Sequence, residues 1–226
     1  MKYSIVFPGQ GSQSLGMLSD LRSNFSVVNE IFQEASDAIN SDLWKIVNDN
    51  QELLSLTENT QPVMLAAGYA TYKVLASEVN LTPISIAGHS LGEYTALVAS
   101  GSLGFFEAVR LVRKRAELMQ EAVPNGSGSM AAILGLDDNI VIEICSIVNA
   151  KGVVEAANFN SPGQVVIAGE IKAVFDACEL MKEAGAKRAL ILPVSVPSHC
   201  SLMKDAAIDF KYSVDNINFQ MGNEKV

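Results

Sequence analysis

The sequence predicts an α/β protein in which a mainly parallel sheet is flanked by helices. Short apolar runs with the character of strands alternate with turn residues and with longer stretches of helical periodicity. Such strand–turn–helix units in series are typical of parallel α/β sheets. Of the 226 residues, 49% are apolar and only 18% are charged, which excludes a disordered tail, a coiled coil and a charged linker. The length suffices for one large domain or two modest ones.

The first half of the chain accounts for the parallel sheet. Residues 3–7 form a short apolar run that Pro8 and Gly9 end, and residues 83–87 form a second run. Apolar residues recur at helical spacing between and after these strands. The expected helices cover residues 22–47, 60–77, 93–99 and 103–122.

The second half has a different pattern, which begins after a glycine- and serine-containing stretch at 124–128. Strands and helices are expected there in the order βαββαβ, which is that of a ferredoxin-like unit. Their bounds are 130–134, 138–148, 153–157, 164–168, 171–184 and 189–192, with 158–163 linking the middle strands. We therefore expect an inserted ferredoxin-like subdomain at 126–193, while residues 1–125 and 194–226 form the main α/β domain.

Charge and cysteine content limit the partners and the cellular compartment that are expected for the protein. The net charge is −9, so nucleic acid is not an expected partner. The longest uncharged run, residues 3–19, contains Pro8 and several glycines, and it cannot span a bilayer. Cys145, Cys178 and Cys200 lack paired spacing, which favours free, buried thiols in a reducing cytoplasm. No Cys/His cluster has metal-ligand spacing, so a structural zinc is not expected, and the protein is expected to be a monomer.

The segment Gly88-His89-Ser90-Leu91-Gly92 fits the G-x-S-x-G nucleophile elbow. Glycines two residues before and after the serine allow a sharp turn between a strand and a helix, which exposes the serine oxygen above the sheet. An apolar strand precedes this segment and a helix is expected after it. The pattern therefore favours a nucleophilic serine on a hydrolase-like sheet, which makes the main domain the catalytic one. The alternative is a glycine-rich turn without chemistry.

A nucleophilic serine needs a base, and the chain has 2 histidines. His89 is adjacent to Ser90, so in an elbow its side chain should diverge from the serine. His199 follows the expected subdomain and is the predicted base. The alternative is that His199 is an ordinary surface or core histidine.

The helix expected at 103–122 carries four cations: Arg110, Arg113, Lys114 and Arg115. The first three are expected on a solvated face. Arg115 differs, because its neighbours three and four residues away are apolar: Leu111, Val112, Leu118 and Met119. A buried guanidinium costs several kcal/mol unless it is paired. Either a protein carboxylate or a substrate anion would provide that partner, and the sequence pattern leaves both open.

Gln10 lies in the turn after the first strand, at the same sheet edge as the elbow. Its amide could serve as an oxyanion donor beside that of Leu91. The spacing alone favours an ordinary glycine turn.

Together these residues resemble the bacterial malonyl-CoA:acyl carrier protein transacylase family, an acyltransferase of fatty acid biosynthesis. The resemblance covers nearly the whole chain in family order. The matching segments are 7–13, 60–62, 88–94, 119–124, 158–164 and 196–200. Family members usually continue well beyond residue 226, so this chain is expected to lack their C-terminal part, which supplies further sheet strands.

The resemblance implies a role for each candidate residue. Ser90 would be the nucleophile and His199 its partner, while Arg115 would bind the malonyl carboxylate. The amides of Gln10 and Leu91 would form the oxyanion hole.

Two further residues, Asn160 and Met119, match positions that line the substrate cleft of the family. The implied substrates are malonyl-CoA and acyl carrier protein, without metal or cofactor. Both substrates are anionic, so local cations near the cleft would have to meet them. The candidate cations are Arg110, Arg113, Lys114, Lys187 and Arg188.

Two rival functions remain. An α/β-hydrolase-type esterase or thioesterase shares the elbow, but it usually places an acid between serine and histidine. Here the intervening acids, such as Asp137, Asp138 and Asp176, fall in the expected subdomain. The second rival is an inactive fragment that serves as a binding module.

Overall fold

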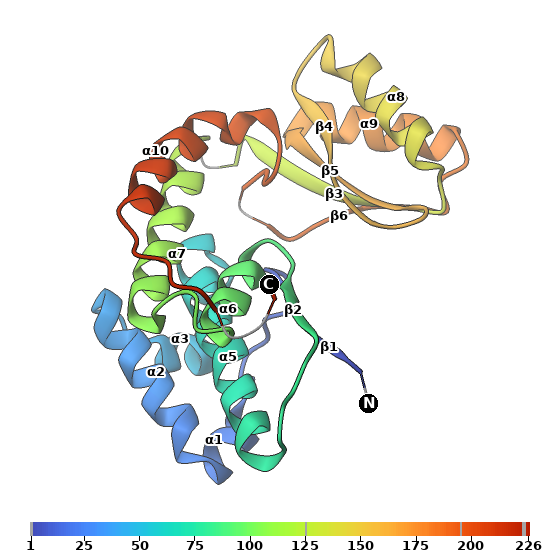
Figure 1. Ribbon diagram of the computed structural model, residues 1–226. Helices are drawn as coiled ribbons and strands as arrows, with labels where there is room; N and C mark the ends of the chain where they lie inside the picture. The colour runs from blue at the N-terminus through green and yellow to red at the C-terminus, as the bar shows by residue number, and fades with distance from the viewer. Residues whose placement is uncertain (1, 125, 195, 223–224) are drawn as a thin grey trace. The chain divides into compact units, whose positions relative to one another are not determined.

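The structure, a computed structural model, describes residues 2–124, 126–194, 196–222 and 225–226. It is a mixed α/β protein, as predicted, and its chain divides into two compact units (Figure 1). The first unit comprises Met1–Ala116 and Tyr212–Val226, and the second comprises Glu117–Lys211. Two helices cross these boundaries: α7 (Phe105–Glu121) and α10 (Lys204–Asp215), the latter preceded by a 3-10 turn at Ser201–Met203.

The first unit contains a parallel pair of strands, β1 (Ser4–Phe7) and β2 (Ser85–Gly88). Their register aligns Ser4 with Ser85 and Phe7 with Gly88. The helices of this unit before α7 are α1 (Ser19–Asn24), α2 (Ser26–Ile39), α3 (Leu43–Asp49), α4 (Gln51–Ser55), α5 (Thr57–Glu78) and α6 (Leu91–Ala99). The predicted parallel sheet therefore has two strands among the described residues, and its side chains pack with α6 through Phe7, Ile86 and Ala96.

The single helix expected at 22–47 is wrong, because three helices occupy that stretch. Phe25 takes an extended conformation between α1 and α2 (φ −132°). Asn40 ends α2 in the left-handed region (φ 50°), and the Asp42 carboxylate accepts a hydrogen bond from the Lys45 amide at the start of α3. These local caps interrupt a helical periodicity that is continuous in the sequence.

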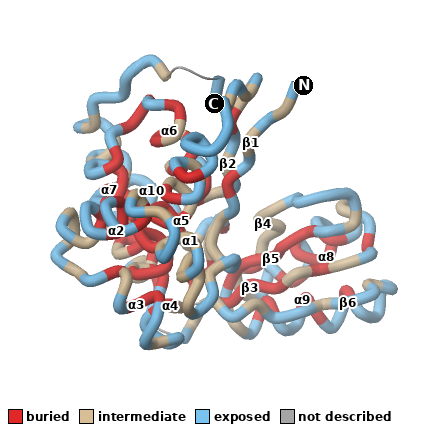
Figure 2. The backbone as a smooth tube through the Cα atoms, turned by 90° about the horizontal axis from the view of Figure 1, so that it is seen from below, coloured by how far each residue is buried: buried red, intermediate tan, exposed pale blue. Residues whose placement is uncertain are grey.

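The second unit contains the predicted succession of elements. These are β3 (Gly128–Leu134), α8 (Asp138–Asn149), β4 (Val154–Ser161), β5 (Gln164–Glu170), α9 (Ile171–Glu183) and β6 (Arg188–Ile191). They form an antiparallel sheet of order β4-β5-β3-β6. Buried residues of β3 and β5 are prominent in Figure 2. Side chains of α8 and α9, among them Val141 and Val174, pack with them in one apolar core.

The link expected at 158–163 is too long. Residues Asn158–Ser161 belong to β4, and only Pro162 and Gly163 remain between β4 and β5. The β4–β5 register shifts between Ala156 and Asn158 and again between Phe159 and Ser161. A bulge puts an extra residue into one strand and leaves it unpaired, so the regular alternation of side chains that marks a strand in the sequence is interrupted at these positions.

Among the described residues, no helix is both long and apolar enough to cross a membrane.

Candidate active site

Ser90 lies at the junction of β2 and α6, where its backbone takes an unusual conformation. It precedes α6 as the N-cap residue, with φ 52° and ψ −105°. A positive φ is uncommon for a residue with a side chain, and such strained residues cluster at active sites. The strand before it and the helix after it provide the context that the G-x-S-x-G pattern requires. This geometry supports the elbow prediction.

The elbow requires both of its glycines for steric reasons. A Cβ atom on Gly88 would lie 1.9 Å from the carbonyl carbon of Gly92. A Cβ atom on Gly92 would lie 2.3 Å from the Phe7 carbonyl oxygen and 2.8 Å from that of Pro8. The α6 N-terminus thus lies directly against the backbone that follows β1. This close approach brings the turn after β1 to the elbow.

Replacing Gly92 with alanine is expected to destabilise the first unit by about 1–3 kcal/mol, the usual cost of overpacking. The new methyl group would clash with backbone atoms, which cannot move aside as a side chain can. A melting curve measures the effect. Gly104→Ala is the matched control, because a Cβ there would meet only the flexible Glu107 carboxylate at 3.1 Å. Equal melting temperatures for both variants would contradict this account.

The Arg115 guanidinium lies at the elbow. Its Nη2 donates a hydrogen bond to Ser90 Oγ at 3.1 Å, and its Nη1 donates to Gln61 Oε1 at 2.9 Å. The guanidinium carbon also lies 5.7 Å from the centroid of the Tyr94 ring, within the range of a cation–π contact. A cation is therefore positioned directly beside the candidate nucleophile.

The electrostatics of Arg115 reflect its burial. Loss of water lowers the pKa of the Arg115 guanidinium, while Tyr94 and Glu93 act in the opposite direction with smaller effects. Burial likewise raises the pKa of the Tyr94 hydroxyl, which Arg115 partly offsets. Both hydrogen bonds described for Arg115 go to neutral oxygens. A poorly hydrated cation with neutral partners is suited to binding an anion.

Arg113 does not lie on a simple solvated face, contrary to the prediction. Its Nη1 donates to the Glu58 carbonyl and to Asn59 Oδ1, both at 3.1 Å. The Glu58 carbonyl would normally accept from the residue at 62 within α5, but Pro62 has no N–H. The guanidinium of Arg113 thus supplies the hydrogen bond that the proline removes.

The two predicted oxyanion donors are both in the first unit. Leu91 is the first residue of α6, so its backbone amide is one of those with no acceptor inside the helix. The residue is 1% exposed. Gln10 follows β1, and its Nε2 donates to the hydroxyl of Thr57 at 3.1 Å. Since Thr57 is fully buried, this contact anchors the turn that carries the Gln10 amide.

The second unit contains the other predicted site residues. His199 is exposed and has a positive φ of 64°, a conformation that is uncommon outside glycine. Met119 is buried in an apolar cluster with Val196 and Met203, and Asn160 is exposed on β4. Ser90 and His199 belong to different units, and their pairing stays a prediction, as do the roles of Met119 and Asn160.

The three cysteines are buried and free. Burial raises the pKa of the Cys145 thiol to about 12, with smaller contributions from Cys178 and Glu155. Burial also raises the pKa of Cys178 and of Cys200. Since the thiolate is the reactive form, these side chains are poor nucleophiles. The part of the chain that the structure describes has no group of three or more His, Cys, Asp or Glu side chains suited to a metal ion.

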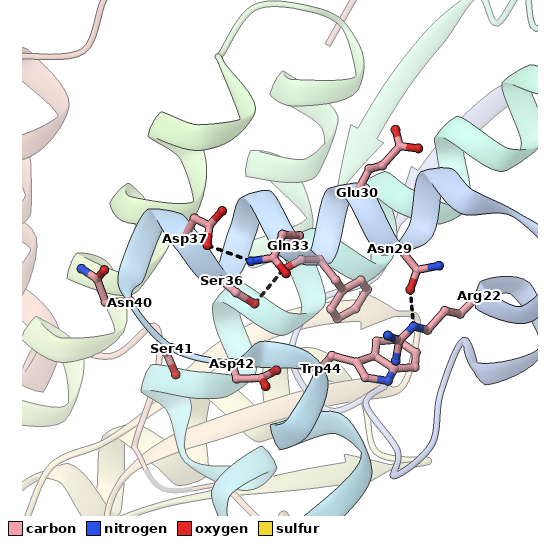
Figure 3. A pocket seen from close by; sticks show the side chains of 11 residues that line it. Arg22, Asn29, Glu30, Gln33, Ser36, Asp37, Asn40, Ser41, Asp42 and Trp44 are labelled. Carbon is pink, nitrogen blue, oxygen red and sulfur yellow. Dashed lines mark hydrogen bonds between the residues drawn. The ribbon is translucent and has the colours of Figure 1, made fainter.

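A polar pocket of about 680 Å³ lies elsewhere in the first unit, against α2 and the start of α3 (Figure 3). Arg22 stacks over the Trp44 ring at 4.2 Å from its centroid and donates a hydrogen bond to Asn29. The other charged residues of the lining are acidic: Glu30, Asp37 and Asp42. None of the predicted site residues lines this pocket.

Comparison with known proteins shows that the chain is an acyltransferase. A family model described as "Acyl transferase domain" matches residues 4–221. The malonyl CoA-acyl carrier protein transacylase of Haemophilus influenzae is 53% identical over 218 residues, which are 96% of this chain and 70% of that protein. The same enzyme of Escherichia coli K12 is 51% identical, over 96% of this chain and 71% of its own length.

Solved structures agree with these relatives. The malonyl CoA-acyl carrier protein transacylase from Coxiella burnetii matches with a TM-score of 0.97 at 45% identity, covering 99% of this chain and 71% of that one. A complex of a type II PKS acyl-carrier protein with its malonyl-transacylase matches with a TM-score of 0.96 at 50% identity, covering 99% and 73%. The chain therefore belongs to the acyl transferase domain family and, within it, to the malonyl CoA-acyl carrier protein transacylases.

Sequence reasoning gave no role to Gln61 and Thr57, which contact Arg115 and Gln10 in the structure. Both are at most 1% exposed. Their signal in the sequence is weak: two uncharged polar residues at the start of a largely apolar helix.

Proposed function

We propose that this chain transfers a malonyl group from malonyl-CoA to the phosphopantetheine thiol of acyl carrier protein, as a step of fatty acid biosynthesis. The observation that carries the proposal is the hydrogen bond from Arg115 Nη2 to Ser90 Oγ. It puts a poorly hydrated cation beside Ser90 Oγ, which supports a site for a negatively charged group at the far end of a short acyl chain on that serine. Malonyl ends in a carboxylate, which a planar guanidinium can bind with two hydrogen bonds.

The proposed reaction is a double displacement. Ser90 Oγ attacks the thioester carbonyl of malonyl-CoA, and His199 takes the serine proton. The amides of Gln10 and Leu91 stabilise the oxyanion. The carbon–sulfur bond breaks, and His199 returns the proton to the departing CoA thiol. In the second half, the carrier thiol loses its proton to His199, attacks the malonyl ester, and Ser90 leaves with that proton.

The wider architecture follows from the same proposal. Residues 1–125 and 194–226 would contribute to a hydrolase-like catalytic domain, in which β1 and β2 belong to a larger parallel sheet. Residues 126–193 would be its ferredoxin-like subdomain, and Asn160 and Met119 would line the cleft. CoA thioesters and carrier protein for fatty acid synthesis are cytoplasmic in bacteria, so the protein is proposed to act there. The proposed cations that meet these anionic substrates are Arg110, Arg113, Lys114, Lys187 and Arg188.

Arg115→Ala is expected to lower the preference for malonyl-CoA over acetyl-CoA by at least about tenfold, given the usual strength of a hydrogen bond to a charged group. Acetyl-CoA lacks the carboxylate and should lose much less. Arg115→Lys keeps the charge without the planar fork, so it should recover only part of the preference. The measurement is kcat/KM for both thioesters.

A melting curve of each Arg115 variant provides the control. If the guanidinium acted only as a structural link between Gln61 and Ser90, both thioesters would suffer alike and stability would fall. An unchanged malonyl-to-acetyl ratio in a well-folded Arg115→Ala protein would refute the substrate role. Release of malonate to water in place of transfer to a thiol would favour the thioesterase alternative.

A further inference from the structure

Gln61 lies on α5 and reaches the site through Arg115. It is 1% exposed, and its Oε1 accepts a hydrogen bond from Arg115 Nη1 at 2.9 Å. The other end of the same guanidinium donates to Ser90 Oγ at 3.1 Å. Because the guanidinium is planar and rigid, fixing Nη1 also fixes the direction of Nη2.

The segment that carries Gln61 is itself held against α7. Arg113, two residues before Arg115, donates to the Glu58 carbonyl and to Asn59 Oδ1. The Asn59 side chain in turn donates to the Leu53 carbonyl at 3.0 Å. The first turn of α5 and the middle of α7 are thus joined by further hydrogen bonds next to the Gln61–Arg115 contact, on its N-terminal side in both helices, and these bonds help to fix the separation of Gln61 and Arg115.

The chemical character of the acceptor is informative. A carboxylate at this place would form a buried ion pair and neutralise the guanidinium. The amide of Gln61 accepts the same hydrogen bond but carries no charge. The geometry of Arg115 is therefore fixed while its positive charge stays uncompensated by this partner.

We propose that Gln61 is a positioning and specificity-determining residue for malonyl transfer. It holds the Arg115 guanidinium beside Ser90 and leaves the guanidinium charge for the carboxylate of the substrate. The inference rests on the proposed function and adds to it the reason for an amide at position 61.

Two substitutions separate orientation from charge. Gln61→Glu keeps the size and the acceptor but adds a negative charge that competes with the substrate carboxylate. Gln61→Met keeps most of the volume but removes the acceptor. Gln51→Glu is the matched control, because Gln51 is exposed on α4 and the change in net charge is the same.

The experiment measures kcat and KM separately for malonyl-CoA and acetyl-CoA, with a melting curve for every variant. Gln61→Glu should lower the malonyl-to-acetyl ratio of kcat/KM about tenfold or more. That is the size expected when the substrate carboxylate loses its charged hydrogen bond to Arg115. The change should lie mainly in the KM for malonyl-CoA, since the carboxylate contact is present in ground and transition state alike. Gln61→Met should lower the ratio less, and Gln51→Glu should leave it unchanged.

A purely structural role predicts a different result, in which both thioesters lose activity equally and the melting temperature falls. An unchanged ratio in a folded Gln61→Glu or Gln61→Met protein would also overturn the inference. In either case, a wild-type chain that prefers malonyl-CoA and loses this preference in Arg115→Ala would leave the proposed function intact. A wild-type chain that accepts neither thioester would overturn both.

Discussion

Ser90→Ala is expected to abolish formation of the malonyl-enzyme, the largest effect of any substitution considered. Alanine retains the Cβ atom, so the backbone at φ 52° is no more strained than with serine, and the fold should persist. What is lost is the only atom proposed to attack the thioester. Intact mass after incubation with malonyl-CoA measures the adduct directly.

The control for this experiment is Ser23→Ala, which removes an exposed hydroxyl that bonds to the Ser19 carbonyl within α1. That variant should be acylated like the wild type. The buried thiols should not replace the serine, because burial holds the pKa of Cys145 at about 12 and raises that of Cys200. A stable malonyl adduct on the Ser90→Ala protein, mapped to Cys200 or another residue, would refute the assignment.

His199→Ala should slow acylation by about 10²–10⁴-fold, the usual range for loss of a general base. The prediction follows from the need of Ser90 for a base and from the scarcity of histidines. Rapid-quench measurement of the malonyl-enzyme gives the rate. His89→Ala is the comparison, since His89 is exposed and should act only through the geometry of the turn. Loss of acylation in His89→Ala with a normal rate in His199→Ala would reverse the assignment of the base.

Much of the fold could be predicted because its elements carry their own periodicity. The strands at residues 4–7 and 85–88 and the succession of elements from β3 to β6 lie close to their expected positions. The breaks between α1, α2 and α3 were missed because they depend on single residues. Asn40 adopts a left-handed conformation and Asp42 caps a helix, and neither interrupts the apolar pattern of the sequence.

In the candidate site, too, residues marked by a local pattern could be predicted, whereas contacts between distant residues could not. A local motif is sufficient to predict Ser90 as the candidate nucleophile. Arg115 can be singled out because its own neighbours on the helix are apolar. The contacts of Gln61 and Arg113 join α5 to α7, and the bonded residues lie 54 positions or more apart in sequence. No local pattern records such a contact, since it depends on how the two helices pack. For that reason Arg113 was misassigned to a solvated face.

The division of the chain into two units has a practical consequence for following its unfolding. The sole tryptophan, Trp44, belongs to the first unit, and its ring packs against Phe32 with centroids 4.9 Å apart. All 3 cysteines belong to the second unit and are buried. Intrinsic fluorescence therefore reports on one unit, and thiol labelling on the other, without any added dye site or mutation. Coincident urea transitions by the two signals would mark a single cooperative unit of folding, whereas separate midpoints would reveal two.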